Sequence, residues 1–148
     1  MPKIALFSYG SNSLDQLKER LGRKPKGTAA WLPGYRRVYR GYSRRWGGGV
    51  ASLKPQHGRI TYGYLSHLDP DEIAILDEYE GVASGNYKHV FVSVRTDADD
   101  GPIEALAYVS TSREENNPTR AYLEAVAKTV GTFWFDDTGK RPTWKDFK

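Results

Sequence analysis

Strand-like runs of apolar, aromatic and β-branched residues dominate the pattern along this chain. The first run, Ile4–Phe7, is short and uninterrupted, as expected of a buried strand. Residues 29–65 contain further runs rich in aromatic and β-branched side chains, with turn residues between them. Residues 86–96 and 103–111 form two more runs, and the Asp- and Gly-containing segment 97–101 between them predicts a hairpin loop.

Three segments break this pattern with apolar residues at helical spacing, and the first lies close to the N-terminus. In residues 13–22, three leucines recur at intervals of three and four positions. Ser13 and Gln16 match a capping box, and Gly22 suits the helix end. Residues 7–13, Phe-Ser-Tyr-Gly-Ser-Asn-Ser, therefore form a turn that joins a strand to a helix.

The second and third helical segments lie in the later part of the chain. In residues 69–81, Asp69 is a suitable N-cap, Pro70 suits the first helical position and Glu72 completes a capping box. Residues 118–134 predict another long helix, and the tail from Asp136 is polar and without a clear pattern.

The order of these elements indicates the fold class. Strands outnumber helices and several follow one another directly, which favours an α+β protein with a small mixed, mostly antiparallel β-barrel flanked by helices. The 148 residues contain no internal repeat and no linker, so we expect a single domain spanning residues 1–148.

Composition narrows the possible chemistry. The chain has no cysteine, which excludes disulfides, thiolate nucleophiles and cysteine-ligated metals. His57, His67 and His89 lie in separate segments without ligand spacing, so we expect no metal. No apolar stretch approaches the roughly 20 residues of a membrane helix, and the first apolar run is too short for a signal peptide. We therefore expect a soluble cytoplasmic protein without a membrane partner.

One carboxylate stands out on the predicted helix 69–81. At about 100° per residue, Ile73, Leu76 and Tyr79 form an apolar stripe, and Glu80 falls between Ile73 and Leu76. Burial would raise the pKa of this carboxyl and suit it to general acid/base catalysis. The alternative is that Gly81 ends the helix early and leaves Glu80 at a frayed, solvated end.

The turn at residues 7–13 also has two interpretations. Small polar residues between a strand and a helix are ordinary capping chemistry. Alternatively, the backbone N–H groups of Gly10, Ser11 and Asn12 form an anion site near a helix N-terminus, where the helix dipole favours a carboxylate or phosphate. The turn lacks the second glycine and the lysine of a Walker A loop, and it is not a G-x-S-x-G nucleophile elbow.

Three motifs in order resemble the gamma-glutamyl cyclotransferase superfamily. They are YGSN after the N-terminal strand, WGGGVASL in the middle, and LDEYEGVASGNYKHVFVSV around the second helix. The resemblance runs from about Ile4 to near Val130. It is closest to the classical branch, which carries Tyr-Gly-Ser-Asn, whereas the gamma-glutamylamine branch more often carries Tyr-Gly-Thr-Leu.

The resemblance implies a small mixed barrel and a specific reaction. The α-amine of a gamma-glutamyl compound would attack its own γ-carbonyl, form 5-oxoproline and release an amine or amino acid, without a metal or organic cofactor. Glu80 matches the family's catalytic glutamate, which acts as general acid/base. The implied substrate-binding residues are Tyr9, Gly10, Ser11, Asn12, Tyr87 and Tyr122.

Two rival functions remain. Five arginines and several aromatic residues between Tyr35 and Trp46 suggest a nucleic-acid-binding barrel, although strand alternation divides the arginines between two faces and the net charge is only +4. The other rival is a catalytically silent member that binds a small ligand or a protein. We expect a small gamma-glutamyl substrate and no nucleic acid. The sequence leaves the leaving amine and the oligomeric state open, with a homodimer as one candidate.

Overall fold

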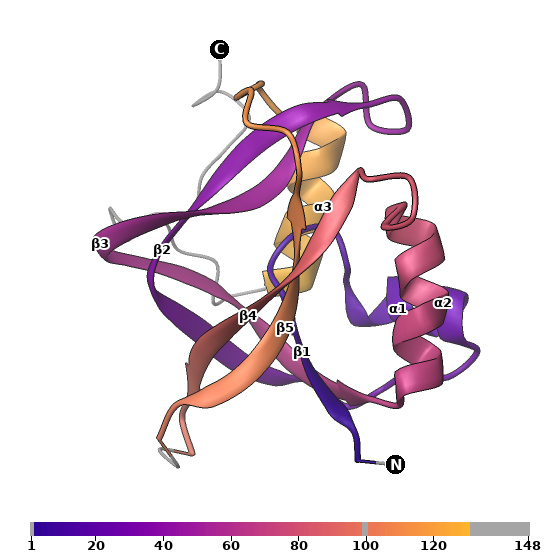
Figure 1. Ribbon diagram of the computed structural model, residues 1–148, viewed down its shortest axis with the longest axis vertical. Coiled ribbons are helices and arrows are strands. Elements are labelled where there is room, and N and C mark those ends of the chain that lie inside the picture. The colour runs from indigo at the N-terminus through magenta and orange to yellow at the C-terminus, as the bar shows by residue number, and fades with distance from the viewer. Residues whose placement is uncertain (1, 99–100, 131–148) are drawn as a thin grey trace.

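The computed structural model describes residues 2–98 and 101–130, which form a barrel with three helices (Figure 1). The elements in chain order are β1 (Ile4–Ser8), α1 (Leu14–Leu21), β2 (Thr28–Ser43), β3 (Gly48–Leu68), α2 (Pro70–Glu80), β4 (Tyr87–Thr96), β5 (Ile103–Ser110) and α3 (Arg120–Val130). The predicted extension of the last helix to Trp134 lies outside the described residues, as do Asp99 and Asp100 of the predicted hairpin loop.

The barrel is closed, with the strand order β1-β3-β2-β4-β5. Strands β1 and β5 pair in parallel, and every other neighbouring pair is antiparallel. The α+β class and the mixed, mostly antiparallel barrel expected from the sequence are therefore confirmed. β4 and β5 pair in antiparallel register from Tyr87↔Ser110 to Val94↔Ile103, as the hairpin prediction required.

The predicted short strands within residues 29–65 are in fact parts of two long ones. β2 and β3 pair from Thr28↔Leu65 to Ser43↔Gly48, and the register shifts after Pro33. Gly34 and Gly58 have φ angles of 82° and 81° near this shift. Glycine adopts such left-handed angles without strain, so the ribbon bends there through a bulge instead of ending in a turn.

The helix caps predicted from the sequence are present in α1 and α2, except for the bond expected from the Gln16 side chain. Gln16 N donates to Ser13 Oγ at 3.2 Å, and Gly22 closes α1 in the left-handed conformation. The reciprocal bond is missing, because Ser13 N donates instead to Ser11 O at 2.9 Å. Gln16 Oε1 is left buried without a partner among the described residues. In α2, Asp69 N donates to Glu72 Oε1 at 2.9 Å, as predicted.

Two apolar clusters form the core, and β1 contributes to both. Leu6 belongs to the cluster beneath α1 and α2, together with Leu17 and Leu76. Phe7 faces the barrel interior, where Val126 of α3 also packs. Adjacent strand residues point to opposite faces, so one short strand supports both clusters. Figure 1 accordingly shows α1 and α2 side by side, apart from α3. No helix in the described ranges is long and apolar enough to cross a membrane.

Leu76→Ala tests the cluster beneath α2. Leu76 is completely buried, and the loss of its side chain should lower the free energy of unfolding by about 2–5 kcal/mol. Ile75→Ala on the same helix removes a side chain that is 40% exposed and should change stability by about 0.5 kcal/mol or less. Urea denaturation measures both, and equal effects would contradict this packing.

Candidate active site

A small cavity of about 40 Å³ lies where the turn after β1 meets the end of α2, the start of β4 and the first turn of α3. It adjoins a larger cleft of about 720 Å³. Both spaces are lined by Ser11, Asn12, Glu80, Tyr87 and Tyr122. The site therefore has an inner chamber and an outer cleft that share one wall.

Buried and half-buried side chains hold both ends of the turn after β1. Arg37 Nε donates to Tyr9 O at 2.9 Å, and its Nη2 donates to Tyr62 O at 2.5 Å. Tyr9 Oη donates to Tyr108 O at 2.6 Å, which ties the start of the turn to β5. Tyr64 Oη donates to Asn12 O at 2.5 Å and fixes the other end.

These contacts use the turn's carbonyl groups and leave its N–H groups unused. The N–H groups of Gly10, Ser11 and Asn12 donate to no acceptor among residues 2–98 and 101–130. Unpaired backbone donors need a partner such as water or a ligand. The turn therefore offers three consecutive amide donors next to the cavity, at the start of α1.

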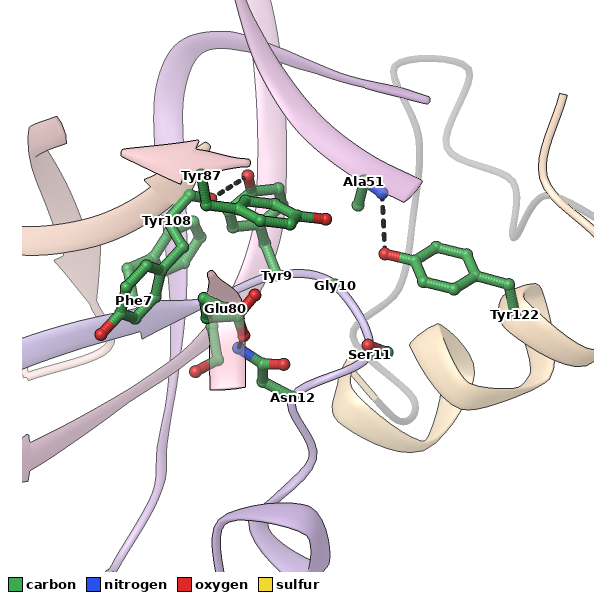
Figure 2. Close-up of a pocket in the computed structure, with 11 residues that line it drawn as sticks. Phe7, Tyr9, Gly10, Ser11, Asn12, Ala51, Glu80, Tyr87, Tyr108 and Tyr122 are labelled. Carbon is green, nitrogen blue, oxygen red and sulfur yellow. Dashed lines mark hydrogen bonds between the residues drawn. The ribbon is translucent and has the colours of Figure 1, made fainter. Parts of the chain in front are cut away.

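Gly10 lies in close approach to α3 and β3, where a side chain would fit only tightly. A Cβ atom at this position would lie 3.2 Å from Tyr122 Oη and 3.3 Å from Ala51 Cβ. Tyr122 Oη is itself held, since it accepts a hydrogen bond from Ala51 N at 2.7 Å (Figure 2). A side chain at position 10 would press on this buried contact.

Glu80 is the last residue of α2, and its carboxylate lies in the site. The helix continues through Glu80 and ends at Gly81, which has a φ angle of 67° and donates to Glu78 O at 3.2 Å. The Glu80 side chain is only 12% exposed, so the alternative of a frayed and solvated end is wrong. Figure 2 shows the carboxylate next to Asn12 of the turn.

The prediction that Tyr79 belongs to the apolar stripe of α2 is also wrong. Tyr79 is 58% exposed, whereas Ile73 and Leu76 are buried. A spacing of three residues falls short of a full turn by about 60°, so the third member of the series has rotated out of the stripe. Tyr79 instead packs against the guanidinium of Arg20, whose Cζ lies 4.6 Å from the ring centroid.

Two polar side chains contact the Glu80 carboxylate. Asn12 Nδ2 donates to Oε1 at 3.1 Å, and Arg20 Nη1 lies 3.4 Å from the same oxygen. Burial raises the pKa of Glu80 above its usual range, and Arg20 and Asn12 offset this effect only partly. The result is a mostly buried carboxyl that can gain and lose a proton closer to neutral pH than an ordinary glutamate.

Tyrosines form much of the remaining wall. Burial raises the pKa values of Tyr9, Tyr87 and Tyr122, so their hydroxyls stay neutral and can donate hydrogen bonds. Tyr87 Oη has no hydrogen-bond partner in the described part of the chain. Tyr108 also lines the cavity, and its hydroxyl donates to Asp77 Oδ1 at 2.6 Å.

The structure brings all the site residues singled out in the sequence to one cavity. They are Tyr9, Gly10, Ser11, Asn12, Glu80, Tyr87 and Tyr122. Sequence reasoning missed Arg20 and Tyr108. Arg20 reaches Glu80 only because α1 packs beside α2, and Tyr108 is a strand residue in an apolar run that gives no separate signal. The described ranges contain no cluster of three histidine or acidic residues that could hold a metal ion.

Comparisons with known proteins agree with this architecture. The model of the AIG2-like family matches residues 61–131. A mouse protein named gamma-glutamylcyclotransferase is 30% identical over 128 residues, which cover 81% of this chain and 66% of the mouse protein. The chain spans 44% of the human and bovine proteins of the same name.

Solved structures extend the similarity to most of the chain. A structure named gamma-glutamyl cyclotransferase has a TM-score of 0.76 and 25% identity, over 88% of this chain and 81% of that one. An uncharacterized human protein has a TM-score of 0.77 and 26% identity, over 89% and 82%. The chain belongs to the superfamily of gamma-glutamyl cyclotransferases and AIG2-like proteins.

The raised pKa of Glu80 predicts how Glu80→Gln changes stability with pH. The folded state holds the proton more tightly than the unfolded state, so this group's contribution to stability is lost as pH rises above about 4.3, the ordinary glutamate pKa. The free energy of unfolding of the wild type should therefore fall relative to that of the variant between about pH 4 and neutral pH.

Denaturation at several pH values measures this difference. Asp71→Asn, which removes an exposed carboxylate from the same helix, controls for the general effect of net charge. A wild type that gains stability relative to Glu80→Gln over this pH range would contradict the burial of an ionisable carboxyl.

Proposed function

We propose that this protein is a gamma-glutamyl cyclotransferase that converts a gamma-glutamyl compound to 5-oxoproline and a free amine or amino acid. The observation that carries the proposal is a mostly buried carboxyl, Glu80, beside a turn with three unused amide donors. The names of the relatives support the same reaction class.

Glu80 acts as both base and acid in this proposal. The attacking α-amine is mostly protonated at neutral pH and must lose a proton before a C–N bond forms to the γ-carbonyl carbon. The original amide C–N bond then breaks, and the departing nitrogen takes up a proton. One carboxylate close to both nitrogens can carry out both transfers, and its raised pKa brings it nearer the operating pH.

The turn binds the part of the substrate that becomes negatively charged. The γ-carbonyl oxygen gains negative charge as the amine attacks, and N–H donors already in place stabilise that charge without reorganisation. Gly10, Ser11 and Asn12 are the candidate donors, with the nearby N-terminus of α1 adding a favourable dipole. Holding the glutamyl chain folded in a small chamber also favours ring closure through proximity.

The two connected spaces suit the two parts of the substrate. The inner cavity, about 40 Å³, is bounded by Glu80 and the turn, whereas the outer cleft is about 720 Å³. In this arrangement the glutamyl end enters first and the scissile amide lies near Glu80, where the spaces meet. The leaving group then occupies the outer cleft.

Glu80→Gln tests the catalytic role directly. Glutamine keeps nearly the same shape but cannot take up or return the proton, so turnover should fall by at least about 100-fold. The measurement is release of 5-oxoproline from a panel of gamma-glutamyl compounds. Asp71→Asn on the same helix is the control and should keep wild-type turnover. An active Glu80→Gln would refute the mechanism, and an inactive wild type would point to a silent member of the family.

Arg20→Met tests the electrostatic environment of Glu80. Arg20 lowers the pKa of Glu80, so its removal should raise that pKa further. The acidic limb of the kcat/KM profile, where Glu80 loses its proton, should then move to higher pH. Lys18→Met on the exposed face of α1 controls for the loss of one positive charge. An acidic limb that stays in place in Arg20→Met would show that another group governs it.

A further inference from the structure

The outer cleft carries an excess of positive charge. Its charged lining consists of Arg20, Arg40, Arg44 and Arg45 against Glu78 and Glu80. Arg20 is already paired with Glu80. The other three arginines come from the end of β2 and the turn that follows it.

None of these three guanidinium groups is paired with a carboxylate within the described residues, and Arg45 acts on Glu80 only as the smallest of the influences that lower its pKa. Arg40, Arg44 and Arg45 make no ion pair there. Arg40 Nε is buried and has no hydrogen-bond partner among the same residues. A buried N–H of a charged group without an acceptor is costly, and native proteins rarely leave one unsatisfied.

The other two arginines of this cluster, Arg36 and Arg37 of β2, do not line the cleft. Arg37 donates hydrogen bonds to the carbonyls of Tyr9 and Tyr62. Arg36 is exposed. The basic cluster noted in the sequence is therefore divided, and only Arg40, Arg44 and Arg45 of it line the cleft.

Trp46 links the arginines to the inner cavity. Its backbone is fixed at both ends, since Trp46 N donates to Ser43 Oγ at 3.2 Å and Trp46 O accepts from Thr119 Oγ1 at 2.9 Å. The guanidinium of Arg45 lies 5.3 Å from the Trp46 ring, and that ring meets Tyr122 edge-on with centroids 5.3 Å apart. Arg45 therefore packs on a Trp46 whose backbone is held in place, next to Tyr122, which lines both the cavity and the cleft.

We propose that the outer cleft selects a leaving amine that carries carboxylate groups, such as an acidic amino acid or acidic peptide attached through its nitrogen to the gamma-glutamyl group. This inference rests on the proposed function. Guanidinium groups bind carboxylates through paired, charge-assisted hydrogen bonds, and three of them suit a leaving group with more than one carboxylate.

The test compares gamma-glutamyl-glutamate with gamma-glutamyl-glutamine. The two compounds have almost the same shape and differ by one charge on the leaving side. The wild type should have a kcat/KM for the acidic compound about tenfold higher or more, the size expected when one charged hydrogen-bond pair is gained. This preference should weaken at high ionic strength because the cleft is open to solvent.

Substitutions locate the preference within the cleft. Arg44→Gln combined with Arg45→Gln should reduce the ratio of the two kcat/KM values toward one, and Arg40→Gln should reduce it too. Arg44 and Arg45 are exposed, so the double variant does not disturb the core. Arg36→Gln removes an arginine of the same strand outside the cleft and should keep the wild-type ratio.

A binding measurement separates this inference from the proposed function. Calorimetry with L-glutamate and L-glutamine needs no turnover, and glutamate should bind more tightly to the wild type than to the double variant. Turnover without any preference for the acidic compound would overturn the inference and leave the reaction standing. Binding of glutamate that depends on Arg44 and Arg45, without release of 5-oxoproline from any compound, would support the anionic subsite and refute the reaction. Equal binding of both amino acids to both proteins would overturn the inference.

Discussion

The position of β1 between β3 and β5 is the constraint on which the rest of the structure depends. This five-residue strand closes the barrel, antiparallel to β3 and parallel to β5. Leu6 and Phe7 support separate apolar clusters on its two faces. The turn after it is then held by Arg37 and Tyr64, so closure of the barrel also fixes the amide donors at the site.

The chemistry of the site depends on an opposition between burial and pairing at Glu80. Burial disfavours the ionised carboxylate, whereas Arg20 and Asn12 favour it. Because burial has the larger effect, the pKa of this carboxyl lies above that of an ordinary glutamate. The C-cap at Gly81 makes this balance possible, since it keeps Glu80 within the helix and turned toward the cavity.

Local sequence patterns predicted much of the fold and of the site, and long-range packing explains the rest. Cap residues such as Asp69 and Gly22 act within one turn of a helix, so the sequence reveals them, and the angle of Glu80 follows from helix geometry. Arg20 and Tyr108 could not be identified in this way, because each reaches the site through the packing of distant elements. Tyr79 was wrongly assigned to the apolar stripe because residues three positions apart drift around a helix. The length of β2 and β3 could not be predicted, because a glycine can bend a strand or end it, and the sequence does not distinguish the two.

The parallel contact between β1 and β5 also has a consequence for the order of folding. Leu6 pairs with Leu106, and Tyr9 bonds the carbonyl of Tyr108, across almost the whole described chain. Loops this long are costly to close, so such contacts form late and slow the folding of a barrel. During synthesis the β2–β3 ribbon can pair well before β5 leaves the ribosome. The residues that line the cavity therefore come together only after nearly every strand has been made.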